Sequence, residues 1–92
     1  MRLTIIADDS SVYKDGVSIH GLNLAGVPEN VHALQWDIDK GWIEFKNESE
    51  FRKPANESIT ELPQWATDAV GVFDSKMTEI QAQPTVQGAQ TL

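Results

Sequence analysis

The chain has 92 residues, a length that fits one domain with one hydrophobic core and leaves no room for a second. It contains no cysteine, which excludes a disulfide framework and a thiolate metal site. Fourteen acidic residues against seven lysines and arginines give a net charge of −7. Direct binding to nucleic acid is therefore not expected, because contacts to the phosphate backbone need cations.

The apolar stretch at residues 2–7 is expected to be a strand and not a signal peptide, because Asp8 and Asp9 follow it at once. No apolar run reaches the roughly 18 residues that a membrane span needs. The sequence therefore predicts a soluble protein with no membrane partner.

Strands and turns are expected up to Lys46. Residues 11–14 and 17–19 flank Asp15-Gly16, a pair that favours a tight turn because glycine readily adopts a positive φ. This pattern predicts a hairpin. Residues 21–30 contain three apolar residues between glycines and a proline, which is typical of an ordered loop.

A second hairpin is expected further along the chain. Residues 31–36 carry apolar groups on both faces, which predicts a central strand, and residues 42–46 return as its partner after a turn at residues 37–41. Trp36 and Trp42 flank this turn. Because aromatic rings bury large areas, we expect both of these strands to pack against a helix and to form the energetic centre of the sheet.

A polar surface loop is predicted for residues 47–60, with Phe51 and Ile59 as its apolar anchors. Apolar residues then recur at intervals of three and four, which predicts an amphipathic helix over residues 62–81 with Pro63 in its first turn. Trp65 and Phe73 are expected to face the sheet. The fold class predicted is α+β, an antiparallel sheet of about four strands with one C-terminal helix.

The C-terminal segment, residues 82–92, is uncharged and has no periodicity, so it is predicted to be a flexible or partner-ordered tail after a single domain at residues 1–81. Pro84, Val86 and Leu92 are its candidate partner-binding residues. An extended segment of this kind can add a strand to the sheet of another subunit.

No catalytic, cofactor-binding or metal-binding residues are predicted. Residues 37–41 resemble the opening of a calcium loop, but Gly41 stands where the fifth position needs an oxygen ligand, so a plain turn is favoured. His20 and His32 have no metal-ligand spacing, and Ser10-Ser11 has no assignable His and Asp partners. We expect a protein that is not an enzyme and needs no cofactor.

Residues 13–59, about half of the chain, contain four segments that together form a recognisable pattern. They are Lys14-Asp15-Gly16, His32-Ala33-Leu34-Gln35-Trp36, Gly41-Trp42-Ile43-Glu44-Phe45 and Pro54-Ala55-Asn56-Glu57-Ser58-Ile59. This pattern resembles small proteins encoded among the tail and tail-fibre genes of tailed bacteriophages. The segment after Gln81 is not part of that pattern.

The resemblance implies a structural or accessory virion protein made in the bacterial host cytoplasm and located in the phage tail, baseplate or fibre attachment. Its partners would be other tail or fibre proteins, with a homo-oligomer as a further option, and the resemblance brings no catalytic residues. Two alternatives stay open. One is a tail-fibre assembly chaperone that is absent from the mature particle, and the other is an acidic inhibitor of a host nucleic-acid-binding protein.

Overall fold

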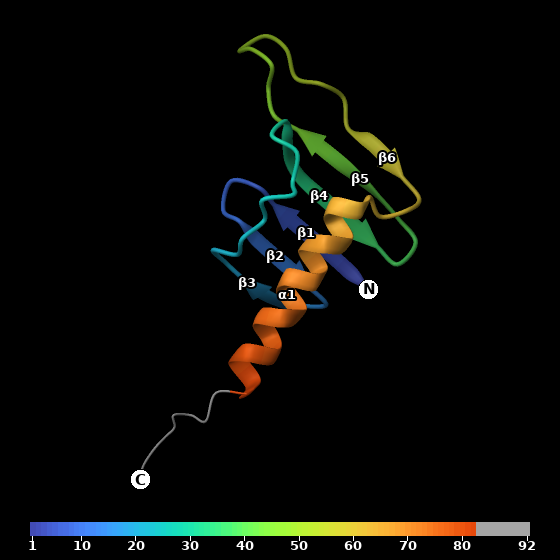
Figure 1. Cartoon of the computed structure of the whole chain (residues 1–92). Coiled ribbons are helices and arrows are strands. Elements are labelled where there is room, and N and C mark those ends of the chain that lie inside the picture. Colours follow the sequence, from blue (N-terminus) through green and yellow to red (C-terminus); the bar gives the residue numbers. More distant parts are fainter. Residues whose placement is uncertain (83–92) are drawn as a thin grey trace.

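The computed structural model describes residues 1–82, which form a six-stranded antiparallel sheet and one helix (Figure 1). The predicted α+β class is confirmed, but the sheet has six strands and not about four. Its strand order is β3-β2-β1-β4-β5-β6. The elements are β1 (Arg2–Ile6), β2 (Ser11–Lys14), β3 (Val17–Ile19), β4 (Val31–Asp37), β5 (Lys40–Phe45), β6 (Glu57–Ile59) and α1 (Gln64–Ala82).

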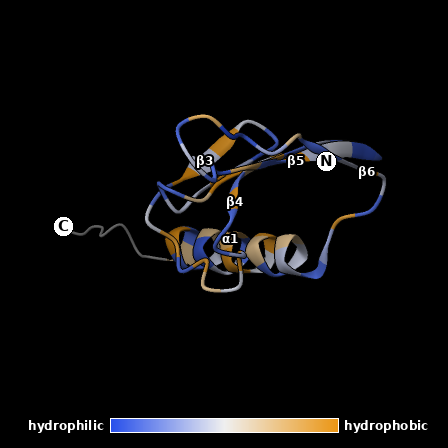
Figure 2. Ribbon diagram, turned by 90° about the horizontal axis from the view of Figure 1, so that it is seen from above, coloured by the Kyte–Doolittle hydropathy of each residue, from blue (hydrophilic) through white to orange (hydrophobic). Residues whose placement is uncertain are grey.

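The helix lies along one face of the sheet (Figure 2). In β1, Leu3 and Ile5 are buried, whereas Thr4 between them points to the other face. This alternation follows from the pleat of a strand, in which successive side chains point to opposite faces. The buried apolar residues that the sheet contributes on the helix side are Leu3, Ile5, Val12, Val31, Leu34, Trp36 and Ile43.

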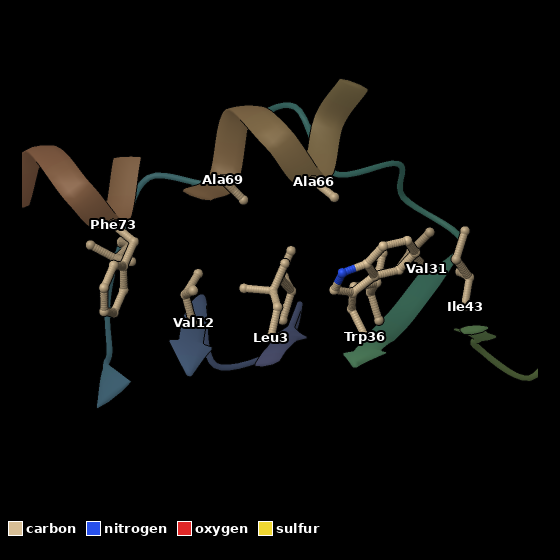
Figure 3. Close-up of a cluster of buried hydrophobic side chains, with 11 residues drawn as sticks. Leu3, Val12, Val31, Trp36, Ile43, Ala66, Ala69 and Phe73 are labelled. Carbon is tan, nitrogen blue, oxygen red and sulfur yellow. The ribbon is translucent and has the colours of Figure 1, made fainter. Parts of the chain in front are cut away.

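Small helix residues allow the helix to approach the sheet closely. Ala66 and Ala69 are buried opposite the large side chains of Leu3 and Trp36, and Phe73 lies beside Val12 (Figure 3). Trp65 packs at the margin of this core and remains partly exposed. The prediction that Phe73 faces the sheet is confirmed, whereas Trp65 lies beside the loop residues Leu24 and Val27. The predicted helix is correct to within two residues at each end.

The predicted hairpin at Asp15-Gly16 is confirmed. Asp15 and Gly16 have φ of 49° and 86°, the positive values of a type I′ turn. The Asp15 carboxylate accepts a hydrogen bond of 2.8 Å from the backbone N–H of Arg2, and the Asp15 N–H donates to the Arg2 carbonyl. These two bonds fix the turn to the start of the neighbouring strand β1.

The β4–β5 connection is tighter than predicted, because its loop consists of Ile38 and Asp39 alone. The Asp39 N–H donates to the Asp37 carbonyl over 2.7 Å, and Ile38 has a φ of 64°. This geometry is that of a γ-turn around Ile38. The short loop sets Trp36 opposite Gly41, and Trp42 therefore points away from the helix. Both strands do contribute core residues on the helix side, but of the two tryptophans that flank the turn only Trp36 lies on that side.

The predicted polar loop at residues 47–60 contains two structured parts. Strand β6 pairs with β5 and places Ile59 against the core, which confirms Ile59 as an anchor. Phe51 is not an anchor, since 91% of it is exposed. It lies in a small hairpin closed by a bridge between Ser49 and Arg52, and this loop projects beyond the sheet (Figure 1).

Replacing Phe73 with alanine is expected to lower the free energy of unfolding by about 3–5 kcal/mol, because only 4% of the side chain is exposed. Urea unfolding followed by tryptophan fluorescence measures the change. Phe73→Leu keeps most of the volume and should cost about 1.5 kcal/mol or less. Equal stability of Phe73→Ala and the wild type would contradict this core assignment.

Gly41→Ala is expected to cost about 1–3 kcal/mol, because a Cβ at Gly41 would collide with the backbone carbonyl of Gln35 and lie 2.9 Å from the Trp36 Cα. Gly26→Ala is the matched control, since a Cβ there meets no atom within 4 Å. It should be neutral or slightly stabilising. Thermal unfolding of both variants separates the two glycines, and equal melting temperatures would contradict the close strand approach.

Candidate protein-binding surface

One continuous row of side chains crosses the sheet face that the helix leaves uncovered. The strand register places its members directly opposite one another from edge to edge. None of them is charged, and two are aromatic. This row, called the open row below, consists of Ser18, Tyr13, Thr4, Gln35, Trp42 and Ser58.

The two aromatic side chains of the open row are well exposed, Tyr13 at 39% and Trp42 at 43%. The indole Nε1–H of Trp42 donates to the Glu44 carboxylate over 2.8 Å, and this bond holds the ring in place. Between the aromatics, the Thr4 hydroxyl donates to the Gln35 side-chain oxygen over 2.7 Å. The row is thus an ordered surface of rings, hydroxyls and an amide.

Charged residues of both signs border the open row at its two sides. On one side, Arg2, Asp37 and Lys40 are opposite one another in the register and all exposed. On the other side the adjacent row is Ser11, Ile6, Ala33 and Glu44. Beyond it, the Asp8 carboxylate lies 3.7 Å from His32 Nδ1 and 3.6 Å from Lys46 Nζ. An uncharged, aromatic centre with a charged rim is the usual composition of a protein–protein interface.

A hollow of about 190 Å³ joins the open row to this rim. Thr4, Gln35 and Trp42 line it from the row, and Arg2 and Asp37 line it from the rim. Its lining offers an aromatic ring, hydrogen-bonding groups and both charges. These groups suit a polar side chain of a protein partner.

The structure does bring together one pair of residues with catalytic potential. The Ser11 hydroxyl lies 2.6 Å from His20 Nδ1, although the sequence assigns no histidine to it. Ser11 has no exposed surface, and no carboxylate among residues 1–82 bonds to His20. Tyr13 instead contacts His20 edge to face, with ring centroids 5.8 Å apart. The pair therefore satisfies a buried hydroxyl and braces the β2–β3 hairpin.

The residues predicted to bind partners, Pro84, Val86 and Leu92, lie outside the described residues. Within residues 1–82, no group of three or more His, Cys, Asp and Glu side chains could hold a metal ion. No helix in that range is long and apolar enough to cross a membrane. The open row was missed in the sequence because its members come from six strands, so only the register brings them together.

Comparison with known proteins gave no match, whether to protein-family models, to curated proteins or to solved structures.

Proposed function

We propose that this chain is a non-enzymatic structural or accessory protein of a tailed-phage virion, and that it acts by binding other proteins through the open row. The observation that supports this proposal is the uncharged row in which Tyr13 and Trp42 are exposed, with charges of both signs at its rim. Exposed aromatic side chains of this kind dominate the energetics of protein interfaces.

The segments that resemble phage tail proteins form a connected part of this surface. The His-Ala-Leu-Gln-Trp segment is in β4 and the Gly-Trp-Ile-Glu-Phe segment is in β5, and the two strands pair with each other. Each segment contributes residues to the helix side, among them Trp36 and Ile43, and one residue to the open row, Gln35 and Trp42. The resemblance thus covers both core residues and exposed residues, and exposed residues suggest a role in binding.

The assembly-chaperone alternative uses the same surface and differs only in whether the chain stays in the particle. The alternative of an acidic inhibitor has less support. A mimic of nucleic acid needs acids aligned along one face, whereas the rim of the open row mixes Arg2, Lys40 and Lys46 with its acids.

The virion assignment is tested by quantitative mass spectrometry of purified particles from cells infected with the phage that encodes the chain. We expect the chain to copurify with tail proteins at a fixed ratio through a density gradient. Absence from particles combined with a complex with fibre subunits in the infected cell would favour the chaperone. Absence from both, with salt-sensitive binding to a basic host protein, would favour the inhibitor.

Trp42→Ala is expected to reduce incorporation into particles at least tenfold, because loss of a central interface aromatic typically costs more than 1.4 kcal/mol of binding. Its stability should change little, since the indole lies on the uncovered face. Ile80→Ala is the matched control, because Ile80 is equally exposed, at 45%, but lies on the helix. Normal incorporation of Trp42→Ala would show that the open row does not bind the partner.

A further inference from the structure

Ile38, in the turn between β4 and β5, combines two features that are unfavourable for folding. Its φ is 64°, in the left-handed region that a β-branched residue rarely adopts, because the branched side chain crowds the backbone there. Ile38 is also 74% exposed, the largest value for any large aliphatic residue among residues 1–82. The side chain therefore strains the backbone without adding to the core, and the stability of the fold does not explain an isoleucine at this position.

The other two-residue turn of the molecule shows which residues such a turn ordinarily contains. Asp15 and Gly16 both have a positive φ, and aspartate and glycine are among the residue types that tolerate it best. Ser10 is the remaining non-glycine residue with a positive φ among residues 1–82, and it too is small and polar. Ile38 is thus the exception within this chain, because asparagine, aspartate or glycine would fit the turn with less strain.

Hydrogen bonds on both sides of Ile38 hold the backbone in this conformation. The Ile38 N–H donates to the Met1 carbonyl over 2.9 Å, and the Asp39 N–H donates to the Asp37 carbonyl over 2.7 Å. A γ-turn with positive φ is the rare and strained form, and such strain persists where the surrounding structure fixes the conformation. The turn therefore presents the Ile38 side chain from a fixed backbone, and this order lowers the entropy lost when a partner covers the side chain.

Charged side chains without ion-pair partners flank Ile38. Asp37 and Asp39 are its neighbours in the chain, and the strand register sets Arg2 and Lys40 opposite Asp37. All four are exposed, and none of them forms an ion pair among residues 1–82. An apolar side chain bordered by charges of both signs has the composition of a protein–protein contact, in which the apolar centre is buried and the rim stays polar.

The turn continues the surface that contains the open row. Asp37 and Trp42 line the same hollow of about 190 Å³, and Ile38 follows Asp37 directly in the chain. Consecutive Cα atoms are about 3.8 Å apart, so a protein that fills this hollow lies within one residue of Ile38. A partner on the open row and a partner on the turn can therefore be the same protein.

We propose that Ile38 anchors the partner contact, and that the protein bound to the open row receives the Ile38 side chain in an apolar recess with charges of both signs at its margin. This inference rests on the proposed function, and it adds the residue and the chemistry that the partner must offer. Binding, and not folding, then requires the isoleucine. The strained turn is retained because the contact stabilises the complex by more than the strain destabilises the free chain.

Two substitutions of nearly the same shape separate folding from binding. Ile38→Asn removes the apolar group and should raise the melting temperature by about 4–8 °C, because asparagine tolerates a positive φ better than a β-branched residue does. Ile38→Leu keeps the apolar group without the β-branch and should be at least as stable as the wild type. Thermal unfolding of the purified chains measures both shifts. A lower melting temperature for Ile38→Asn would show that the turn is not strained and would overturn the proposal.

Competition for incorporation tests binding in the same variants. Cells that make equal amounts of wild type and one variant are infected with phage from which the gene is deleted, and mass spectrometry gives the ratio of the two chains in purified particles. We expect Ile38→Asn at one tenth of the wild type or less and Ile38→Leu within about threefold of it, as for the loss and the retention of an interface hot spot. Ile80→Asn makes the same polar change at an exposed helix residue and should be incorporated like the wild type.

The outcomes separate this inference from the proposed function. A wild type that enters particles together with equal amounts of Ile38→Asn would overturn the anchor and leave the proposed function standing. Equal losses of Ile38→Asn and Ile38→Leu would also overturn it, because an apolar recess admits leucine. Absence of the wild type itself from particles would overturn the proposed function and the anchor with it.

Discussion

The close contact between the alanines of the helix and the large side chains of the sheet determines the rest of this structure. Ala66 and Ala69 leave the volume that Leu3 and Trp36 fill, and Phe73 supplies the bulk where the facing residue is the smaller Val12. Protein cores are close-packed, so such alternation of large and small residues gives one preferred seat for the helix. The Lys14 ammonium lies 2.7 Å from the Asp74 carboxylate, and this ion pair links strand β2 to the helix.

Because one face of the sheet packs against the helix, the composition of the other face is restricted. A small domain has few apolar residues, and here most of the buried ones serve the helix side. The open row on the uncovered face consists of hydroxyls, an amide and two exposed rings. The strands that build the core also hold these groups in register. A rigid core on one side thus orders the side chains on the other, and such ordering lowers the entropy cost of the binding proposed for that face.

Local signals in the sequence predicted the local structure, and the errors concern pairing. Asp15-Gly16 specified a type I′ turn, and apolar residues at intervals of three and four specified the helix. Strand β6 was missed because Glu57-Ser58-Ile59 carries only one apolar residue, and its pairing with β5 makes it a strand. The turn was predicted to have five residues and has two, and this sets the register that turns Trp42 away from the helix. A shift of one residue reverses every side chain of a strand.

The two edges of the sheet offer little room for pairing with another strand. Strands β3 and β6 form the two edges, and each has only three residues. Short edges offer few unpaired backbone groups, and this protects a sheet against uncontrolled strand pairing. Under the proposed function, residues 1–82 therefore contact a partner through side chains of the open row and not through an added strand. Hydrogen bonds hold Thr4, Gln35 and Trp42 in place, so the open row presents a fixed pattern of groups.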